Sequence, residues 1–341
     1  MARICQPLFR FAAGFASEQK LPRRPPAVTF RFSSFLYKSL ICFYITDDGS
    51  KPLTAVCLFS WRSDQMSSMR SVCFLVFCAG LTLVSAANPL SAVEIVGHRG
   101  ASFDAPENTL SSVNLAWERN ADAVEIDIYL TSDGKIVAFH DKTTKRIGGR
   151  NKDVAKQTLA ELQTLDVGAW KNAQYRNERI PTLPQILKTI PAGKRLFIEI
   201  KCGPEVLPQL KADLQASGKA ADQTALIGFD YDTMRKAKQL MPGLKAYWVF
   251  KVKQNKVTRR WEHNADYYIR KAKEANLDGL DVGYNGFLTA DFIQKSEAAG
   301  LPVFVWTIND VKDAKKLVEM GITGITTDRP GLMMETLKQA E

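Results

Sequence analysis

The sequence predicts an α/β protein of the (β/α)8 barrel class, with a small insertion after the second strand. Two observations predict it. From residue 93 onward, short runs of β-branched and aromatic residues alternate with amphipathic stretches, which is typical of parallel strands joined by helices. Eight such units fill roughly 250 residues, the usual size of a closed barrel. A doubly wound open sheet is the alternative for the same alternation.

The eight expected strands are short, apolar and bounded by turn-forming or polar residues. They are 93–97, 123–130, 195–201, 224–229, 244–250, 277–283, 302–308 and 322–327. The stretches between them repeat apolar residues at helical spacing. They predict helices at 108–119, 183–190, 204–216, 231–240, 263–275, 289–299, 310–319 and 330–338.

The rhythm is interrupted after the second strand. Residues 131–141, TSDGKIVAFHD, contain an Asp-Gly turn and then a short extended return. The following stretch to residue 183 is polar, contains glycines and is too long for an ordinary connection. We therefore expect an insertion at about residues 141–183, which forms a lid or a small subdomain on the face where barrels carry their functional loops.

The front of the chain differs from the rest in charge and cysteine content. Residues 1–87 hold 10 Lys and Arg and 4 Asp and Glu, a net +6, which leaves 36 and 32, a net +4, for residues 88–341. Five of the six cysteines also precede residue 88, so Cys202 alone cannot form an internal disulfide in the remainder. Residues 88–341 show no clustered basic face of the kind that binds nucleic acid. The most basic stretch, 251–260, is interpreted as a solvated loop, with an anion-binding or membrane-binding patch as the alternative.

Residues 69–87 have the pattern of a secretory signal peptide. Arg70 is followed by an apolar stretch and by the small residues Ser85, Ala86 and Ala87, where we expect cleavage. The apolar stretch is shorter than the ~20 residues that span a membrane, so no stable membrane insertion is expected after cleavage. The pattern predicts a secreted or periplasmic protein whose domain is residues 88–341.

Residues 1–68 do not fit ahead of a signal peptide. We expect translation to start at Met69 or Met66, so that residues 1–68 are an over-called or poorly ordered extension. An organellar transit peptide at residues 1–24, which are rich in Arg and poor in acids, is the alternative.

Two carboxylates interrupt the second strand. Glu125 and Asp127 are two apart, so both side chains leave the same face of the strand. Buried carboxylates without partners are costly, which indicates that a cation, a hydrogen-bond network or water belongs beside them.

Other polar residues fall at the carboxyl ends of the expected strands, where barrels carry their active sites. These are His98 and Arg99 after the first strand, His140 at the end of the extended return, Glu199 and Lys201 on the third strand and Trp306 on the seventh. Two of only three histidines belong to this set, which favours a shared role over separate structural ones.

The residue types indicate a chemistry. Three carboxylates without a zinc-like Cys or His grouping favour one hard divalent cation, Mg²⁺ or Ca²⁺, bound by Glu125, Asp127 and Glu199. Arg99 and Lys201 could hold an anionic substrate such as a phosphodiester, and two histidines can act as general acid and base near neutral pH. The alternative is a purely structural ion-pair network among the same charged groups.

Five motifs in this order resemble the glycerophosphodiester phosphodiesterase family: HRGASFDAPENT (98–109), EIDIYLTSDGKIVAFHD (125–141), IEIK (198–201), VWTIND (305–310) and TDRPG (327–331). The resemblance covers about residues 93–338. It implies a TIM barrel that uses a divalent cation to hydrolyse small glycerophosphodiesters to glycerol 3-phosphate and an alcohol.

The resemblance also implies residue roles. His98 and His140 would be the acid/base pair, Arg99 and Lys201 would hold the phosphate, and Trp306 would line the substrate pocket or only pack there. Glu125, Asp127 and Glu199 would bind the metal. Independently of the resemblance, Asn108 is interpreted as a helix cap and turn organiser rather than a catalyst.

Three other functions stay open on these residues. A phosphodiesterase of the same superfamily, similar to phospholipase D toxins, would act on a lysophospholipid and release a cyclic phosphate. A degenerate ligand-binding barrel is less suited, because the set of charged residues is complete. A carboxylate glycosidase is less suited, because it leaves His98 and Lys201 without a role. The headgroup and the oligomeric state are not indicated.

Overall fold

The computed structural model of the chain describes residues 34–37, 40–46, 52–59 and 93–338, which fall in two units that are described separately. In the first unit, β1 (Ser34–Tyr37), β2 (Leu40–Thr46) and β3 (Pro52–Phe59) form a three-stranded antiparallel sheet, which the sequence analysis did not expect. The predicted signal peptide at residues 69–87 lies outside the described residues. The assignment of residues 1–68 to an over-called or poorly ordered extension stays a prediction.

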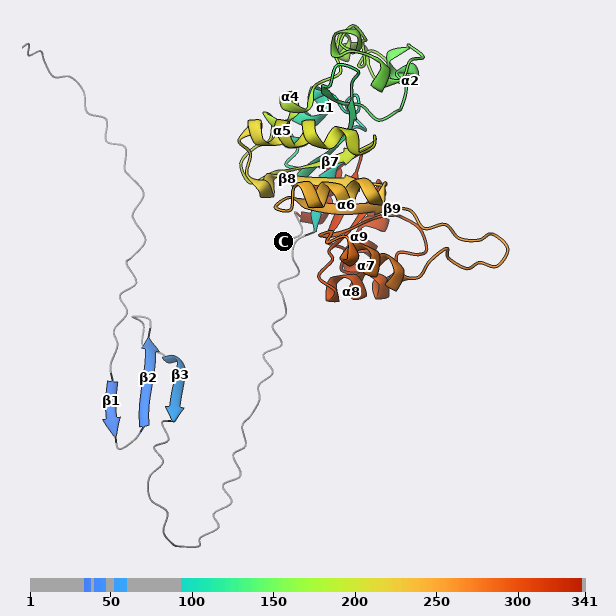
Figure 1. The fold of residues 1–341 in the computed structure, drawn as a ribbon. Coiled ribbons are helices and arrows are strands. Elements are labelled where there is room, and N and C mark those ends of the chain that lie inside the picture. The colour runs from blue at the N-terminus through green and yellow to red at the C-terminus, as the bar shows by residue number, and fades with distance from the viewer. Residues whose placement is uncertain (1–33, 38–39, 47–51, 60–92, 339–341) are drawn as a thin grey trace, which may run out of the picture. The chain divides into compact units, whose positions relative to one another are not determined.

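The second unit is a closed parallel barrel, as predicted (Figure 1). Its strands are β4 (Glu94–Gly97), β5 (Ala123–Leu130), β7 (Arg195–Ile200), β8 (Thr224–Gly228), β9 (Lys245–Phe250), β10 (Gly279–Gly283), β11 (Val303–Trp306) and β12 (Gly324–Thr327). They pair in the order β4-β12-β11-β10-β9-β8-β7-β5, and β4 also pairs with β5, which closes the ring. A doubly wound sheet would leave two open edges, so that alternative is wrong.

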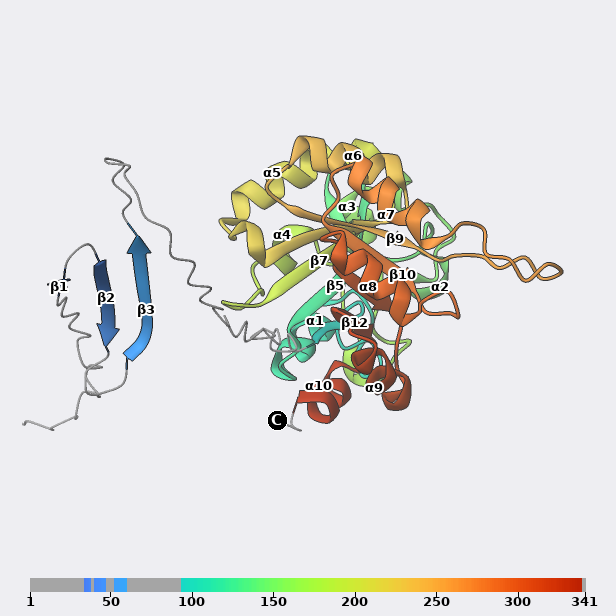
Figure 2. The same ribbon diagram turned by 90° about the horizontal axis from the view of Figure 1, so that it is seen from below.

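Helices surround the barrel in the view of Figure 2. They are α1 (Leu110–Glu118), α4 (Leu183–Leu187), α5 (Leu207–Ser217), α6 (Tyr231–Leu240), α7 (Ala265–Glu274), α8 (Ala290–Ala298), α9 (Val311–Glu319) and α10 (Pro330–Lys338). The bounds differ from the expected ones by at most three residues, at the end of α4 and at the start of α5, and α1 begins two residues later than expected. Asn108 has a φ of +58°, which is not helical, and the side chain of Thr109 caps the helix by accepting from the backbone N–H of Ser112.

Side chains alternate between two apolar layers along each strand. One set faces the helices and forms the large cluster that includes Ile95, Val124 and Ile126. The other set faces the inside of the barrel; it comprises Val96, Ala123, Phe197, Ala225, Ile227, Tyr247, Val249 and Phe304, with Trp306 packed against it. The interior is therefore filled with side chains, and it carries Glu125, Asp127 and Glu199 on the same strand faces further along.

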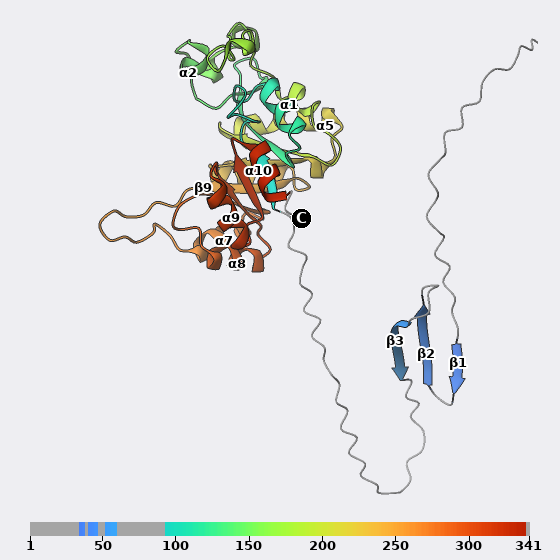
Figure 3. The same ribbon diagram turned by 180° about the vertical axis from the view of Figure 1, so that it is seen from behind.

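The segment after β5 has its own small core. The short strand β6 (Ile136–Ala138) pairs antiparallel with the end of β5. Beyond it, α2 (Lys145–Gly148), α3 (Leu159–Leu162) and two 3-10 turns precede α4, and α2 lies at one end of the barrel in Figures 1 and 3. A separate apolar cluster stabilises the segment, made of Val137, Phe139, Ile147, Val154, Leu162, Leu165, Val167 and Ile180.

A second irregular segment, residues 251–262, follows β9. It projects away from the barrel as a long narrow loop in Figures 1, 2 and 3. Among the residues whose placement is described, no helix combines the length and the apolar character needed to cross a membrane.

Candidate active site

Three carboxylates gather inside the carboxyl end of the barrel. Glu125 and Asp127 come from β5, and Glu199 comes from β7, where it lies opposite Asp127 in the strand register. All three are buried, with exposed fractions of 2%, 1% and 8%. One oxygen atom from each lies within 4.8 Å of the others, so the three predicted metal ligands are brought together.

The carboxylates keep unused oxygen atoms. Glu125 accepts a hydrogen bond from the backbone N–H of Arg99 at 2.9 Å through Oε2, while its Oε1 has no hydrogen-bond partner among the described residues. Oδ1 of Asp127 likewise makes no hydrogen bond there, although Nζ of Lys201 lies 3.3 Å away as an ion pair. Burial and the neighbouring acids raise the pKa of Glu125 well above its ordinary value and that of Glu199 to about 7. A group of buried, partly unpaired oxygen ligands fits a hard divalent cation.

Two cations flank these acids. Nε of Arg99 lies 3.1 Å from Oδ2 of Asp127, and Nζ of Lys201 donates to Oε1 of Glu199 at 2.8 Å. The guanidinium of Arg99 is shared, because its Nη1 also donates to Glu107 at 2.8 Å. Three carboxylates therefore face two cations, one of which is committed elsewhere. A purely structural ion-pair network among these five side chains would leave more carboxylates than cations.

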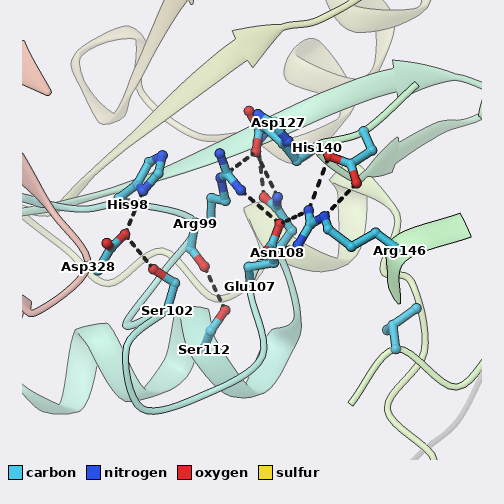
Figure 4. Close-up of polar contacts among 12 residues, drawn as sticks. His98, Arg99, Ser102, Glu107, Asn108, Ser112, Asp127, His140, Arg146 and Asp328 are labelled. Atoms are coloured by element: carbon cyan, nitrogen blue, oxygen red, sulfur yellow. Dashed lines mark hydrogen bonds and ion pairs between the residues drawn. The ribbon is translucent and has the colours of Figure 1, made fainter. Parts of the chain in front are cut away.

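His98 is oriented from the far end of the sequence. Its Nδ1 lies 2.6 Å from Oδ1 of Asp328, which follows β12 (Figure 4). Ser102 donates to the same oxygen, and Asn309 donates to the other. Burial would raise the pKa of Asp328, but these hydrogen bonds and His98 hold it well below its ordinary value. Asp328 is thus an anion that fixes the His98 ring and leaves Nε2 available.

His140 has the same arrangement through a nearby residue. Its Nδ1 lies 2.7 Å from Oδ1 of Asp141, and Asp141 in turn receives two hydrogen bonds from Arg146, at 2.6 and 3.1 Å. Burial, together with the positive charge of Arg99 and Lys201, lowers the pKa of His140 despite the opposing effect of Asp127. The ring is therefore favoured in its neutral form near pH 7.

Arg146 connects this histidine with Arg99. Besides its bonds to Asp141, it donates to both carboxylate oxygens of Glu107, at 2.9 and 2.8 Å, and Glu107 accepts from Arg99 (Figure 4). Two bidentate contacts fix the guanidinium plane, which is a geometry that lysine does not provide. The insertion thereby holds both sides of the site through one side chain.

The expectation that Asn108 caps α1 is wrong, because Thr109 is the cap. Asn108 is 2% exposed and bonds to Asp127 twice. Its Nδ2 donates to Oδ2 of Asp127 at 2.8 Å, and its Oδ1 accepts from the backbone N–H of Asp127 at 3.0 Å. The positive φ of Asn108 turns the side chain inward, so this residue orients a predicted metal ligand.

A cavity of about 120 Å³ opens between these groups. Its lining is His98, Arg99, Glu125, His140, Glu199, Lys201, Ile227, Phe229, Val249, Asp281, Trp306 and Thr326. All predicted site residues except Asp127 thus face one space, and Asp127 contacts two of them. Trp306 lines the wall, where its ring meets that of Phe229 edge to face with centroids 5.5 Å apart.

Asp281 lies in the cavity wall and was missed by the sequence analysis. It is 4% exposed, and its Oδ1 has no hydrogen-bond partner among the described residues. Burial and the nearby Glu199 raise its pKa to about 8. The only signal in the sequence was a second aspartate inside the strand-like run LDGLDVG, on the inward-facing side.

The other missed residues belong to quoted motifs. Glu107 lies in PENT, Asp328 in TDRPG, and Asp141 directly after His140. Motif order located them near the site, but nothing in the sequence indicated which side chain each would contact. Arg146 had no signal beyond its place in the insertion.

A closed (β/α)8 barrel with paired histidines, flanking cations and clustered acids at its carboxyl rim defines an enzyme of the TIM-barrel phosphodiesterase class, a hydrolase. The model of the glycerophosphoryl diester phosphodiesterase family matches residues 98–332. The chain belongs to this family.

Individual relatives agree with that assignment. A Bacillus subtilis protein, provisionally named a glycerophosphodiester phosphodiesterase, is 33% identical over 251 residues, which cover 71% of this chain and 96% of the relative. A glycerophosphodiester phosphodiesterase of Caldanaerobacter subterraneus is 28% identical and is covered over 98% of its length. Among solved structures, an Oleispira antarctica phosphodiesterase in complex with the product sn-glycerol-3-phosphate matches with 29% identity and a TM-score of 0.64, over 71% of this chain and 96% of that one.

Proposed function

We propose that the chain is a metal-dependent hydrolase that converts glycerophosphodiesters to glycerol 3-phosphate and an alcohol, with His98 and His140 as the general acid/base pair. The observation that carries the proposal is the shared cavity, which is lined by both histidines, both cations and two of the three clustered carboxylates. The solved relative that holds sn-glycerol-3-phosphate supports the same substrate class for this chain.

Each group has a task in phosphodiester cleavage. Arg99 and Lys201 bind the nonbridging phosphate oxygens, since both are cations in the cavity wall. One histidine removes the proton from the attacking hydroxyl as its oxygen bonds to phosphorus. The other donates a proton to the departing alkoxide as the bond between phosphorus and the alkoxide oxygen breaks. Asp328 and Asp141 hold the two rings at Nδ1, which leaves each Nε2 for this proton transfer.

Glu125, Asp127 and Glu199 would hold one divalent cation, Mg²⁺ or Ca²⁺. When bound, the cation would supply charge neutralisation at the phosphate oxygens. Asn108 would keep the Asp127 carboxylate in place through its two hydrogen bonds.

The attacking hydroxyl belongs either to water or to the glycerol carbon next to the ester. The second route gives a cyclic phosphate first, which water then opens. A related reaction that stops at the cyclic phosphate on a lysophospholipid is the alternative function, and no observation on the described residues favours it.

The test is product analysis. The purified protein is incubated with glycerophosphocholine, glycerophosphoethanolamine and glycerophosphoglycerol in Mg²⁺ or in Ca²⁺, and glycerol 3-phosphate is measured. We expect release from at least one diester with one of the ions. Cyclic phosphate from a lysophospholipid, without glycerol 3-phosphate from any diester, would favour the alternative.

We also propose that the protein works outside the cytoplasm, as a secreted or periplasmic enzyme. The signal-peptide pattern at residues 69–87 supports this. Mass spectrometry of the native N-terminus tests it: a mature chain that begins near Asn88 is expected, and a chain that retains residues 69–87 would contradict the proposal.

A further inference from the structure

The loop after β9 carries an unusual concentration of positive charge. Five of its ten residues from 251 to 260 are Lys or Arg, and none is acidic: Lys251, Lys253, Lys256, Arg259 and Arg260. All five are exposed. Within the described part of the chain, no ion pair involves any of them, whereas many other surface cations have acidic partners. Their charge is therefore available to an external anion.

The loop is an ordered hairpin (the basic hairpin, residues 251–262). The backbone N–H of Asn255 donates to the carbonyl of Arg260 at 2.8 Å, and that of Glu262 donates to Lys253 at 2.9 Å. At the turn, Oδ1 of Asn255 accepts from the backbone N–H groups of Val257 and Thr258, at 2.9 and 2.8 Å. The cations are thus displayed on a defined projection.

An apolar residue occupies the tip of the basic hairpin. Val257 is 90% exposed, the largest value among the exposed large hydrophobic residues of the described chain. At the base, by contrast, the ring of Trp261 packs edge to face on Phe287 with centroids 5.6 Å apart. An ordered turn that exposes valine between cations has the composition of a peripheral membrane contact.

The basic hairpin also lies on the functional face. It follows the carboxyl end of β9, and the candidate active site is built at the carboxyl ends of β4, β5 and β7. Figures 1 and 3 show the hairpin extending well beyond the body of the barrel. The basic hairpin and the candidate active site therefore lie at the same end of the barrel strands.

We propose that the basic hairpin docks the enzyme on the surface of an anionic phospholipid bilayer, with Val257 at the level of the headgroups and the five cations on the lipid phosphates. Long-range electrostatic attraction brings the hairpin to the surface, and the valine contributes apolar contact among the headgroups. Nucleic acid is a weaker match, because residues 251–260 contain no aromatic side chain for base stacking. The proposal does not depend on which diester is cleaved.

The experiment is sedimentation of the mature protein, residues 88–341, with vesicles of phosphatidylcholine alone or with one quarter phosphatidylglycerol. We expect binding to the anionic vesicles only, and weaker binding in 0.5 M salt as an assay condition (about three times physiological ionic strength). Lys253→Glu with Lys256→Glu should weaken the vesicle affinity by at least about tenfold. Val257→Ser should weaken it without any change in charge.

A charge-matched control separates docking from general electrostatics. Lys236→Glu with Lys315→Glu changes the net charge equally, on the exposed surfaces of α6 and α9, and should retain binding. Thermal unfolding and hydrolysis of a soluble diester should be unchanged in every variant. Absence of binding to anionic vesicles, or equal losses in the hairpin and control variants, would overturn the proposal. Tighter binding to a DNA duplex than to the vesicles, unaffected by Val257→Ser, would also overturn it.

Discussion

Nδ1 of His98 lies 2.6 Å from Oδ1 of Asp328, a residue 230 positions away in the sequence. Asp328 is held in turn by Ser102 and Asn309, so the ring orientation is fixed by three further side chains. His140 is fixed in the same way by Asp141. Both rings are therefore held at Nδ1 in advance of substrate, and this preparation is what efficient proton transfer requires.

The first prediction concerns the histidine pair. His98→Ala and His140→Ala should each lower kcat by about 10²–10⁴-fold or more, because each removes a group that we propose to transfer a proton. His263 provides the matched control: its ring stacks on Tyr267 outside the cavity, and His263→Ala should retain normal turnover. Thermal unfolding should show that all three variants are folded. A near-normal rate in either site variant would remove the acid/base assignment.

The second prediction is metal dependence. EDTA should inactivate the enzyme, and Mg²⁺ or Ca²⁺ should restore it, because the cation that we propose for the three buried carboxylates would neutralise charge at the phosphate oxygens. The ion should also raise Tm, since a ligand at 100 times its Kd stabilises the folded state by about 2.7 kcal/mol. Glu199→Gln should reduce this rise. Full activity after exhaustive chelation would show that the carboxylates have another role.

The third prediction concerns Arg146, which bridges Asp141 and Glu107. Arg146→Gln should lower kcat by roughly 10- to 100-fold with a smaller effect on KM, because small displacements of catalytic groups are costly. Arg146→Lys should restore only part of the rate.

Arg150 is the matched control for that prediction. It lies in the same insertion but bonds to Gln157, Thr164 and the carbonyl of Glu161, away from the cavity. Arg150→Gln should leave kcat near normal. An equal loss of activity in both variants would indicate that the insertion merely needs to be folded.

The fold could be predicted because its signals are local. Each barrel strand is rich in β-branched and aromatic residues. The eight strands and their helices lie close to the positions that these patterns predicted. The closeness of the site residues could also be predicted. The carboxyl ends of parallel strands meet at one rim of a barrel, so Glu125, Glu199 and Lys201 were expected to be neighbours.

The contacts between side chains could not be predicted. His98 finds Asp328 only through closure of the barrel, and no spacing in the sequence encodes that pair. Asn108 was expected to cap a helix, because Asn favours caps; its positive φ instead turns it toward Asp127. Asp281 was not predicted as a site residue, because a single acid in an apolar run does not indicate whether its side chain is buried beside other acids.

The fourth prediction uses Asp281 and pH. Its pKa is about 8 in the folded protein against an ordinary value of 3.8, so the folded state binds its proton more tightly than the unfolded state. The cost of this carboxyl is absent below pH 4 and grows, as pH rises to about 8, by at most about 1.4 kcal/mol per pH unit. In metal-free protein, Asp281→Asn should therefore raise Tm at pH 8 and change it little at pH 4.

The neighbouring aspartate of the same run gives the contrast. Asp278 accepts from Lys238 at 2.6 Å and from the backbone N–H of Ala246 at 3.0 Å. Asp278→Asn should therefore lower the free energy of unfolding at pH 8. A destabilised Asp281→Asn variant at that pH would mean that a water or an ion already satisfies the Asp281 carboxyl.

The pairing of β12 with β4 has a consequence for biosynthesis. The backbone N–H of His98 donates to the carbonyl of Thr327, and Asp328 comes next in the chain. A nascent polypeptide that stalls before residue 324 contains every acid of the cluster and both histidines, yet lacks the strand that seats the first of them. We therefore expect a chain that ends before residue 324 to lack hydrolase activity, because Asp328 cannot orient His98 in it.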